Sequence, residues 1–192
     1  MNKLLHTLIP PPPWRMPVAM LLGIFAGLFL YTFKVSNAVS YLSDEPETCI
    51  NCHIMRPEYA SWFHSSHRLT TTCNDCHVPH NNVVNKYFFK AKDGLRHATI
   101  FTLRAEPQVI QIKDAGKKVV QENCKRCHER ANGLINTRNV TYQTSMNGAG
   151  HKCWDCHRYT PHGTVKSLSS TPNTITPRLN SPAPKWLHQI TK

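Results

Sequence analysis

Four copies of one short motif contain all eight cysteines of this 192-residue chain. Each copy has two cysteines separated by two residues and followed at once by a histidine: Cys49, Cys52 and His53; Cys73, Cys76 and His77; Cys124, Cys127 and His128; Cys153, Cys156 and His157. C-x-x-C-H is the attachment motif of c-type haem. Zinc sites and redox dithiols also use C-x-x-C, but neither requires a histidine in the fifth place. The sequence therefore predicts four covalently bound haem c groups.

The irons of these haems need further ligands, because an electron-transfer haem usually has two strong axial ligands. His6 and His188 are expected to lie too far away to serve. The remaining candidates are His64, His67, His80, His97, His151 and His162. Met55 follows His53 by two residues and is another candidate for the first iron. From the spacing alone, ligation by Met55 and simple packing of its side chain against the ring both stay open.

The strongly basic composition, formally +12, does not by itself indicate nucleic acid. Four haems bring about eight propionates, so the haem-loaded protein is only moderately basic. The excess of Lys and Arg is better explained by propionate partners and by charged interfaces, and no nucleic-acid motif is present. No C-x-x-C-K motif marks an open haem that would reduce a small oxyanion. We therefore expect the chain to pass electrons on rather than to reduce the final substrate itself.

An uncharged apolar run, Met16 to Phe33, lies between Arg15 and Lys34. As a helix it would be about 27 Å long, just enough to cross the hydrocarbon core of a bilayer. We interpret it as an uncleaved anchor in contact with membrane lipid, although a weak cleavage site at Ser36-Asn37-Ala38 keeps a signal peptide open. A second open question is whether Gly23 and Gly27 pair two anchor helices or are chance glycines.

Orientation follows from the charges and from the haems. Lys3 and Arg15 flank the N-terminal side of the apolar run, which is a modest signal for the cytoplasmic side. Because haem c is attached outside the cytoplasm, all four motifs must lie beyond the run. We predict a single-pass protein of the cytoplasmic (inner) membrane, with its N-terminus in the cytoplasm and its haem domain in the periplasm.

The rest of the chain must hold four haems in roughly 155 residues, too few to bury a large side-chain core around each. We predict a mainly α fold with much irregular structure, one N-terminal transmembrane helix, and a multihaem c-type cytochrome domain whose core is the haems. Motifs one and two form one pair and motifs three and four another. The predicted helices are Pro57 to Arg68, Val83 to Leu103 and Gln108 to Glu122. The predicted divisions are 1–15 (cytoplasmic N-terminus), 16–34 (anchor), 35–165 (tetrahaem domain) and 166–192 (extended tail).

Several segments together resemble the NapC/NirT family of membrane-bound, quinol-oxidising cytochromes, over about residues 15 to 175. They are the anchor helix, the four motifs and CINCHIM at the first of them. Within this family the chain is most similar to the small subunits of cytochrome c nitrite reductases. That narrower likeness is carried by SWFHSSHRLTTTCNDCHVPH (61–80), KAKDGLRHATIFT (90–102), VVQENCKRCH (119–128) and KCWDCHRYTPHGTVKSLSSTPN (152–173).

The resemblance implies a set of iron ligands. Met55, not His53, should bind the first iron, and His77, His128 and His157 should be the proximal ligands of haems two, three and four. His67 matches a distal ligand of the fourth haem, and His162 matches one of the third. Haem two then resembles the exit haem, whose distal ligand is a lysine of the catalytic partner.

The resemblance also implies a menaquinol site near haem one. Its lysine corresponds to Lys90, and His97 stands where a relative has an acidic residue. His97 can ligate haem one, accept a quinol proton or only pack, and Asp93, one turn before it, can orient it or be a solvated charge. These roles are left open.

The function implied is oxidation of menaquinol and transfer of its electrons to a periplasmic pentahaem nitrite reductase catalytic subunit, which makes ammonium from nitrite. In this reading the chain is the quinol dehydrogenase or electron-transfer subunit and not the nitrite-reducing one. The alternatives are a NapC-type quinol dehydrogenase that feeds another periplasmic reductase, a freestanding electron-storage cytochrome, and a terminal reductase.

Overall fold

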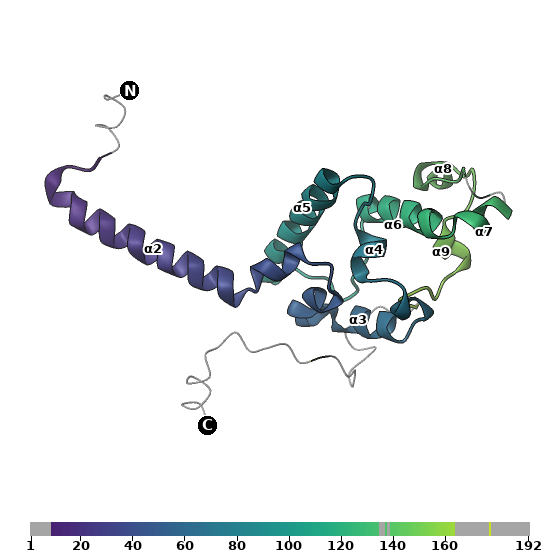
Figure 1. Ribbon diagram of the computed structural model, residues 1–192, viewed down its shortest axis with the longest axis horizontal. Coiled ribbons are helices and arrows are strands. Elements are labelled where there is room, and N and C mark those ends of the chain that lie inside the picture. The colour runs from purple at the N-terminus through teal and green to yellow at the C-terminus, as the bar shows by residue number, and fades with distance from the viewer. Residues whose placement is uncertain (1–8, 135–136, 138, 164–176, 178–192) are drawn as a thin grey trace. The chain divides into compact units, whose positions relative to one another are not determined.

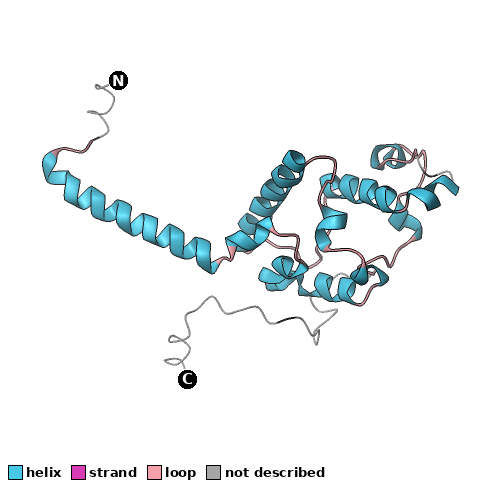
Figure 2. Ribbon diagram, in the orientation of Figure 1, coloured by secondary structure: helices cyan, strands magenta, loops and turns pink. Residues whose placement is uncertain are grey.

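The computed structural model of the chain describes residues 9–134, 137, 139–163 and 177. It divides into two compact units, residues 1–39 with 180–192 and residues 40–179, which are described separately. Every regular element in the described residues is an α-helix or a 3-10 helix, and these residues contain no strand (Figure 2). The predicted fold class, mainly α with one N-terminal apolar helix, is therefore confirmed.

The first unit is built on the apolar helix α2 (Arg15–Val35), which follows the 3-10 turn η1 (Pro12–Trp14). A proline at the start of the turn removes a backbone N–H that would have had no helical partner. Arg15 donates from Nε to the Pro10 carbonyl at 3.3 Å. After the helix, Asn37 takes a left-handed φ of 52°. Asparagine adopts this conformation more readily than most residues, so it is well suited to end a helix.

No residue of α2 is buried by protein, although the helix is almost entirely apolar. An 18-residue window within Pro12–Val35 has a mean hydropathy of 2.0, and among the described residues this is the one helix long and apolar enough to cross a membrane. Its 21 residues rise about 31 Å, close to the thickness of a hydrocarbon core, about 30 Å. A helix of this kind removes its apolar surface from water by entering lipid, so α2 has the properties of a membrane anchor.

The second unit consists of short helices joined by loops, with α5 (Val83–Thr102) and α6 (Asp114–Cys127) the longest (Figure 1). The 3-10 turns are η2 (Ala38–Leu42), which crosses the unit boundary, η3 (Pro46–Asn51), η4 (His53–Met55) and η5 (Ser66–Leu69). The remaining helices are α3 (Arg56–Phe63), α4 (Cys73–His77), α7 (Glu129–Leu134), α8 (Tyr142–Met146) and α9 (Cys153–Cys156).

Two of the three predicted helices in this unit have different bounds. The helix expected from Pro57 to Arg68 ends at Phe63, because Ser65 is extended and its Oγ caps a new 3-10 turn by accepting from the His67 N–H. The helix expected from Gln108 begins only at Asp114. Ile112, just before it, folds back so closely on Gly116 that a Cβ there would lie 2.8 Å from Ile112 Cγ1. The long central helix, α5, agrees with its prediction to within one residue.

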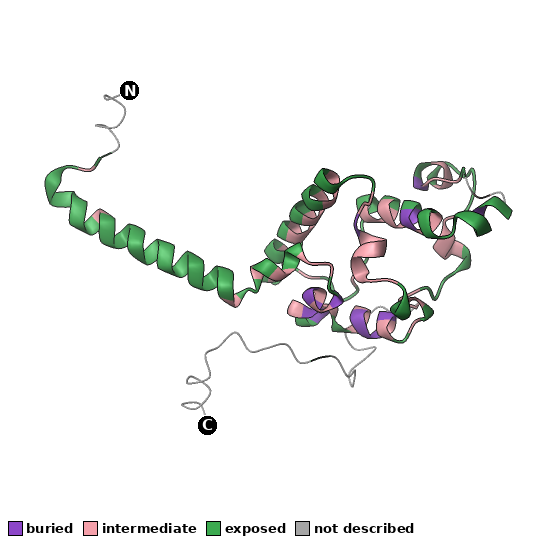
Figure 3. Ribbon diagram, in the orientation of Figure 1, coloured by how far each residue is buried: buried purple, intermediate pink, exposed green. Residues whose placement is uncertain are grey.

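The apolar core that the peptide itself provides is small. Ile50, Tyr59 and Trp62 form the core cluster, with Phe63 packed against it and a Tyr59–Trp62 ring separation of 5.4 Å. Figure 3 shows buried residues in a few places only, on helices that are otherwise half-buried or exposed. A unit of about 140 residues usually buries much more of its apolar surface than this. Its interior therefore fits a fold in which bound groups supply much of the core.

Candidate functional site

Each of the four C-x-x-C-H motifs lies on or at the end of a short helical segment. The first spans η3 and η4, the second is α4, the third ends α6, and the fourth is α9 followed by His157. Residues three apart share one side of a helix, so each helical motif presents both sulfurs to that side. All eight thiols are free; six are half-buried, and Cys127 and Cys156 are exposed.

An aspartate inside the motif starts the helix in two cases. Asp75 accepts from the Thr72 N–H at 2.7 Å, and Asp155 accepts from the Lys152 N–H at 2.9 Å. In both, the carboxylate is the third residue of its helix and satisfies a donor at the helix N-terminus. In C-N-D-C and C-W-D-C the aspartate therefore stabilises the start of the short helix that carries both cysteines.

Sulfurs of successive motifs lie beside one another. Cys49 and Cys73 are hydrogen-bonded, which lowers the pKa of the Cys49 thiol and raises that of Cys73. Cys124 and Cys153 are paired in the same way, with the pKa of Cys124 raised and that of Cys153 lowered. The four attachment sites thus fall into the two pairs expected from the sequence, one and two, and three and four.

Three amide side chains tie the motifs together in chain order. Asn74 of motif two donates to Asp44 Oδ1, in the loop before motif one, at 2.8 Å. Asn123 of α6 donates to the Cys76 and Val78 carbonyls of motif two at 2.9 and 2.8 Å. Gln121, one turn before motif three and only 1% exposed, accepts from the Cys153 N–H of motif four at 3.1 Å. Helix α6 is therefore the element that connects motifs two, three and four.

Two pairs of histidine rings have the separation expected on either side of one iron. The ring centres of His67 and His128 are 6.1 Å apart, and those of His77 and His162 are 6.0 Å apart. Two metal–imidazole bonds of about 2 Å, each with about 1.1 Å from nitrogen to ring centre, give a separation of about 6 Å. Ordinary edge-to-face ring contacts have the same separations, so the ligand pairs stay a prediction.

This pairing differs from the allocation that the resemblance implies. His67 was expected on the fourth haem, but it lies beside His128 of motif three. His162 was expected on the third haem, but it lies beside His77 of motif two. Among the described residues no histidine ring contacts His157, which is exposed. These contacts do not assign distal ligands, so the allocation that the resemblance implies, with the second motif as the one completed by a partner, stays a prediction.

The remaining histidine candidates have other surroundings. His64 packs edge-on against Phe63 at 5.6 Å, and His80 Nε2 lies 3.2 Å from the Asn74 carbonyl. His151 is exposed. His53 is also exposed and meets Phe101 of α5 at 5.7 Å, whereas Met55 is half-buried. These positions do not decide between His53 and Met55 as the ligand of the first iron, so that assignment stays a prediction.

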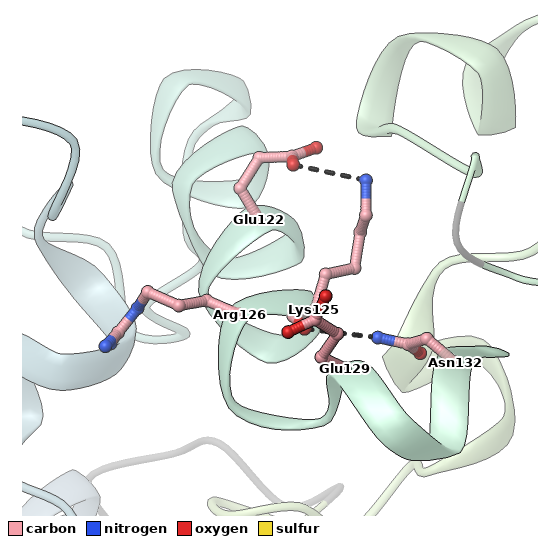
Figure 4. A pocket seen from close by; sticks show the side chains of 5 residues that line it. All are labelled: Glu122, Lys125, Arg126, Glu129 and Asn132. Carbon is pink, nitrogen blue, oxygen red and sulfur yellow. Dashed lines mark hydrogen bonds and ion pairs between the residues drawn. The ribbon is translucent and has the colours of Figure 1, made fainter.

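The polar groups around the motifs fit haem. The indole N–H of Trp62 is buried and has no hydrogen-bond partner among the described residues, so it is a donor that a propionate would satisfy. A pocket of about 450 Å³ lies beside motif three, and Lys125 is one of the five side chains that line it (Figure 4). The Lys125 ammonium pairs with Glu122 at 3.2 Å. Basic side chains of this kind are suitable partners for porphyrin carboxylates.

A lysine pair lies close to motif one. Lys90 is 12% exposed and donates to the Ser43 carbonyl at 2.7 Å and to Asp44 Oδ1 at 3.1 Å. Lys86 forms an ion pair with the same carboxylate. Burial by itself raises the pKa of Asp44, but hydrogen bonds from the two lysines and from Asn74 outweigh it and lower the pKa to about 2. The Lys90 charge also contributes to the lowered pKa of Cys49, after the larger effect of Cys73.

The other two predicted quinol-site residues lie further along α5. His97 Nε2 is 3.6 Å from Asp93 Oδ2, and their side chains are 58% and 47% exposed. Lys86, Lys90, Asp93 and His97 recur every three or four residues, so they share one side of the helix. Phe101, one turn further, contacts His53. This side of α5 therefore meets the loop before motif one at Lys86 and Lys90, and motif one itself at Phe101.

The opposite side of α5 is apolar and exposed. Val84, Phe88 and Leu95 lie there at helical spacing and are 80%, 67% and 72% exposed. Nothing in the described residues packs over them. The helix thus has one face on motif one and an uncovered apolar face, hereafter the outer face of α5.

Several residues that hold the site together carry no recognisable signal in the sequence. Asn74, Asn123 and Gln121 are polar residues in polar stretches, so no hydrophobic periodicity marks them. Asp44 lies in a loop, and no sequence motif marks it as a site residue. Glu58, which pairs with His162 at 3.1 Å, follows Pro57 and looks like an ordinary acidic residue in the first turn of a helix. Only spatial contacts identify these five.

Some expectations lie outside the described residues. They include the SLSSTPN segment, most of the predicted tail (166–192), and the histidines His6 and His188. The structure gives no information on them.

Comparisons with known proteins point to one family. Residues 13–167 match the NapC/NirT cytochrome c family, N-terminal region. The chain is 42% identical over 156 residues to the cytochrome c-type protein NrfH of Wolinella succinogenes, covering 80% of this chain and 88% of that protein. It is 35% identical over 128 residues to the cytochrome c nitrite reductase subunit NrfH of Nitratidesulfovibrio vulgaris, covering 67% and 74%.

A solved structure also matches. It is the crystal structure of the cytochrome c nitrite reductase NrfHA complex bound to the HQNO inhibitor. One chain of that complex is 29% identical to this one with a TM-score of 0.54, and the match covers 85% of this chain and 99% of that chain.

Proposed function

This chain belongs to the NapC/NirT cytochrome c family, and from that premise we propose that it is the membrane-anchored, quinol-oxidising subunit of a cytochrome c nitrite reductase. The family binds haem c covalently, and α2 supplies the membrane anchor. The observation that carries the proposal is the arrangement of the attachment motifs. They form a linked series that begins at the lysine pair of α5 and ends at the exposed Cys156 and His157.

We propose four haems, one on each motif. The eight cysteines would hold them by thioether bonds. His77, His128 and His157 would be proximal axial ligands, His67 and His162 would be distal ones, and Met55 would bind the iron of motif one. When bound, these haems supply reversible one-electron chemistry. The side chains hold them close together, because Cys49 contacts Cys73 and Cys124 contacts Cys153.

The substrate proposed for motif one is menaquinol. A lysine ammonium has three donors. Among the described residues, two donors of Lys90 are used by Ser43 and Asp44, which leaves one for a quinol oxygen. The positive charge would stabilise the negative charge that develops on this oxygen as the quinol loses its protons. Asp44, with its low pKa, stays ionised and keeps Lys90 in place.

His97 is proposed as the proton acceptor. Histidine is the side chain that most often serves as a general acid or base in proteins. The Asp93 carboxylate at 3.6 Å stabilises the imidazolium that results, and the exposure of His97 lets it pass the proton to water. The outer face of α5 is a suitable surface toward the lipid from which a quinol arrives. The haem unit would lie in the periplasm.

The electrons would leave at motif four. Its Cys156 and His157 are exposed, so another protein can approach that site. The proposed partner is the catalytic subunit of the nitrite reductase, in line with the assembly named for the solved relative.

The test compares two lysines that share one carboxylate. Lys90→Met removes the donor nearest motif one, so quinol-dependent nitrite reduction by membranes should fall about 100- to 1,000-fold, the usual effect of losing a donor to developing charge. Lys86→Met is the control, because Lys86 binds the same Asp44; it should retain activity within about twofold. Reduction of the haems by dithionite should be unchanged in both.

Equal losses in the two variants would mean that the lysines act only by holding Asp44. Unchanged activity of Lys90→Met would exclude Lys90 from the quinol site. If the wild-type chain in membranes cannot be reduced by any naphthoquinol, an electron-storage cytochrome would replace the proposed function.

A further inference from the structure

The outer face of α5 is a continuous row of apolar residues. Val84, Phe88, Ala91 and Leu95 recur every three or four residues, so they lie in one line along the helix. All four are exposed, and no residue of α5 is buried by the described protein (Figure 3). An uncovered apolar row of this length is typical of a surface that binds another protein or a membrane.

The hydroxyl groups on this side of α5 are satisfied inside the helix itself. Thr99 donates from Oγ1 to the Leu95 carbonyl at 2.8 Å, and Thr102 donates from Oγ1 to the Ala98 carbonyl at 2.7 Å. A hydroxyl that bonds to its own helix needs neither water nor a polar partner. Polar groups in contact with lipid must be satisfied in this internal way, so the C-terminal half of this side is also compatible with lipid.

Two cations border the apolar row. Lys92 follows Phe88 by four residues, and Arg96 follows Lys92 by four, so both lie along the same border of the row. Neither side chain forms an ion pair or a hydrogen bond within the part of the chain that the structure describes. An apolar helix face bordered by Lys and Arg is the pattern of a helix that lies in a membrane surface containing anionic lipid.

The inner face of α5 is bonded to the segment that leaves the anchor helix. Lys90 donates to the Ser43 carbonyl at 2.7 Å, and Lys86 forms an ion pair with Asp44. Ser43 comes eight residues after Val35, the last residue of α2. The chain between them spans at most about 28 Å. A lipid surface is therefore within reach of α5 through the tether that is bonded to it.

We propose that α5 is a second membrane contact of this protein, an interfacial helix with its outer face in lipid and with Lys92 and Arg96 at the level of the lipid phosphates. Such helices lie in the plane of the membrane, with the apolar face about 5–10 Å into the boundary between headgroups and acyl chains. The inference rests on the membrane anchoring in the proposed function, but it requires neither Lys90 nor a quinol.

The test places a photo-cross-linking residue on α5 of the full-length, haem-loaded protein in native membranes. Phe88→p-benzoylphenylalanine and Leu95→p-benzoylphenylalanine should each form adducts with phospholipid, detected by mass and by labelled lipid phosphate. Leu134→p-benzoylphenylalanine is the matched control, because Leu134 is apolar and 89% exposed but lies on α7, which follows motif three. It should form few lipid adducts or none. Haem staining confirms that each variant is loaded.

Three outcomes would overturn the proposal. They are cross-links from Phe88 and Leu95 to a protein instead of lipid, the absence of lipid adducts at both positions, and an equal yield of lipid adducts from Leu134. The result is separate from quinol chemistry. A chain that oxidises no naphthoquinol but forms lipid adducts at Phe88 and Leu95 would refute the proposed substrate and support the lipid contact.

A second measurement tests the two border cations. In vesicles made of equal amounts of phosphatidylglycerol and phosphatidylcholine, the adducts formed at Phe88 should be enriched in phosphatidylglycerol. Lys92→Gln combined with Arg96→Gln should lower this enrichment by up to about fivefold per charge, the usual attraction of one Lys or Arg to an anionic lipid surface. Lys118→Gln, which removes an exposed cation of α6, should leave the enrichment unchanged. Equal enrichment in the wild type and the double variant would overturn the placement of Lys92 and Arg96 at the phosphates.

Discussion

The first and fourth haem-attachment motifs share one sequence pattern but are built differently. Motif one runs through two 3-10 turns, and its Ile50 and Ile54 are buried, with Ile50 in the apolar core cluster. Motif four is the four-residue helix α9, and its second cysteine and its histidine are exposed. Two apolar residues of the first motif thus lie in the protein interior, although its His53 is exposed, whereas both the second cysteine and the histidine of the fourth lie at the surface.

The residues around the two motifs also differ in how enclosed or exposed they are. The loop before motif one is bonded to α5, a helix that carries Lys90 on one face and exposed apolar residues on the other. Near motif four, Tyr159 is 73% exposed and Arg158 is exposed as well. A region that binds a small lipid-soluble reductant needs enclosure and a fixed charge, while a region that passes electrons to a protein needs an accessible surface. The contrast therefore agrees with entry at motif one and exit at motif four.

The largest expected effect comes from removing each attachment site in turn. Replacing Cys49 and Cys52 by alanine deletes the haem next to Ile50 and Ile54, so the core cluster loses a neighbour and the protein should fail to accumulate. Replacing Cys153 and Cys156 should give a stable protein with three haems, because that motif lies at the surface. Haem staining and intact mass of solubilised membranes measure both results. If both variants accumulate equally, the first motif is not part of the core.

A smaller effect, a loss of about 10- to 30-fold in affinity for the catalytic subunit, is expected from a change at the surface near motif four. Tyr159→Asp places a charge on the proposed exit face, and an interface tyrosine commonly contributes about 2 kcal/mol to binding. Affinity for the nitrite reductase catalytic subunit should fall accordingly, while reduction by a naphthoquinol should remain. Affinity can be measured by surface binding with detergent-solubilised protein.

Phe88→Asp, on the outer face of α5, is the reciprocal change. It should slow quinol-dependent reduction of the haems and leave affinity for the catalytic subunit unchanged. Should Tyr159→Asp slow quinol oxidation or Phe88→Asp weaken partner binding, the assignment of entry and exit to opposite motifs would be wrong.

The two regions also differ in how much of them the sequence could predict. The attachment cysteines can be predicted from a local motif. Helices α2 and α5 can be predicted from hydropathy and from helical periodicity. The pairing of His67 with His128 and of His162 with His77 depends on how distant segments pack, and local spacing does not contain that information. The allocation of distal ligands that the resemblance implies is not tested by these contacts and stays a prediction.

The links between motifs were missed for a related reason. Gln121 and Asn123 are buried polar residues whose partners are backbone atoms of other segments. A pattern of apolar residues predicts which face of a helix is buried only when the buried residues are apolar. In α6, Gln121 and Asn123 are the buried residues, and the haem-rich interior leaves little apolar peptide surface to signal them.

The smallest expected effect concerns the carboxylate that anchors the lysines of motif one. At pH 7 Asp44 is ionised and bonds to Lys86 and Lys90, so Asp44→Asn should destabilise the protein. Because Asp44 is 43% exposed, solvent screening reduces the expected loss to about 1 kcal/mol. The measurement is the thermal midpoint of the detergent-solubilised protein, followed by circular dichroism of the haem bands.

The dependence of this loss on pH has a definite sign. The folded-state pKa of Asp44, about 2, lies below the ordinary value of 3.8. The carboxylate therefore contributes its full stabilisation above about pH 4, and loses it as the pH falls toward about 2. The difference between wild type and Asp44→Asn should be largest near neutral pH and disappear at the acid end. Asp114→Asn, near motif three, is the comparison, because Asp114 also has a lowered pKa, mainly through the Tyr142 hydroxyl, but is fully exposed. Its effect should be smaller than that of Asp44→Asn at every pH, and a larger one would show that exposure does not distinguish the two regions.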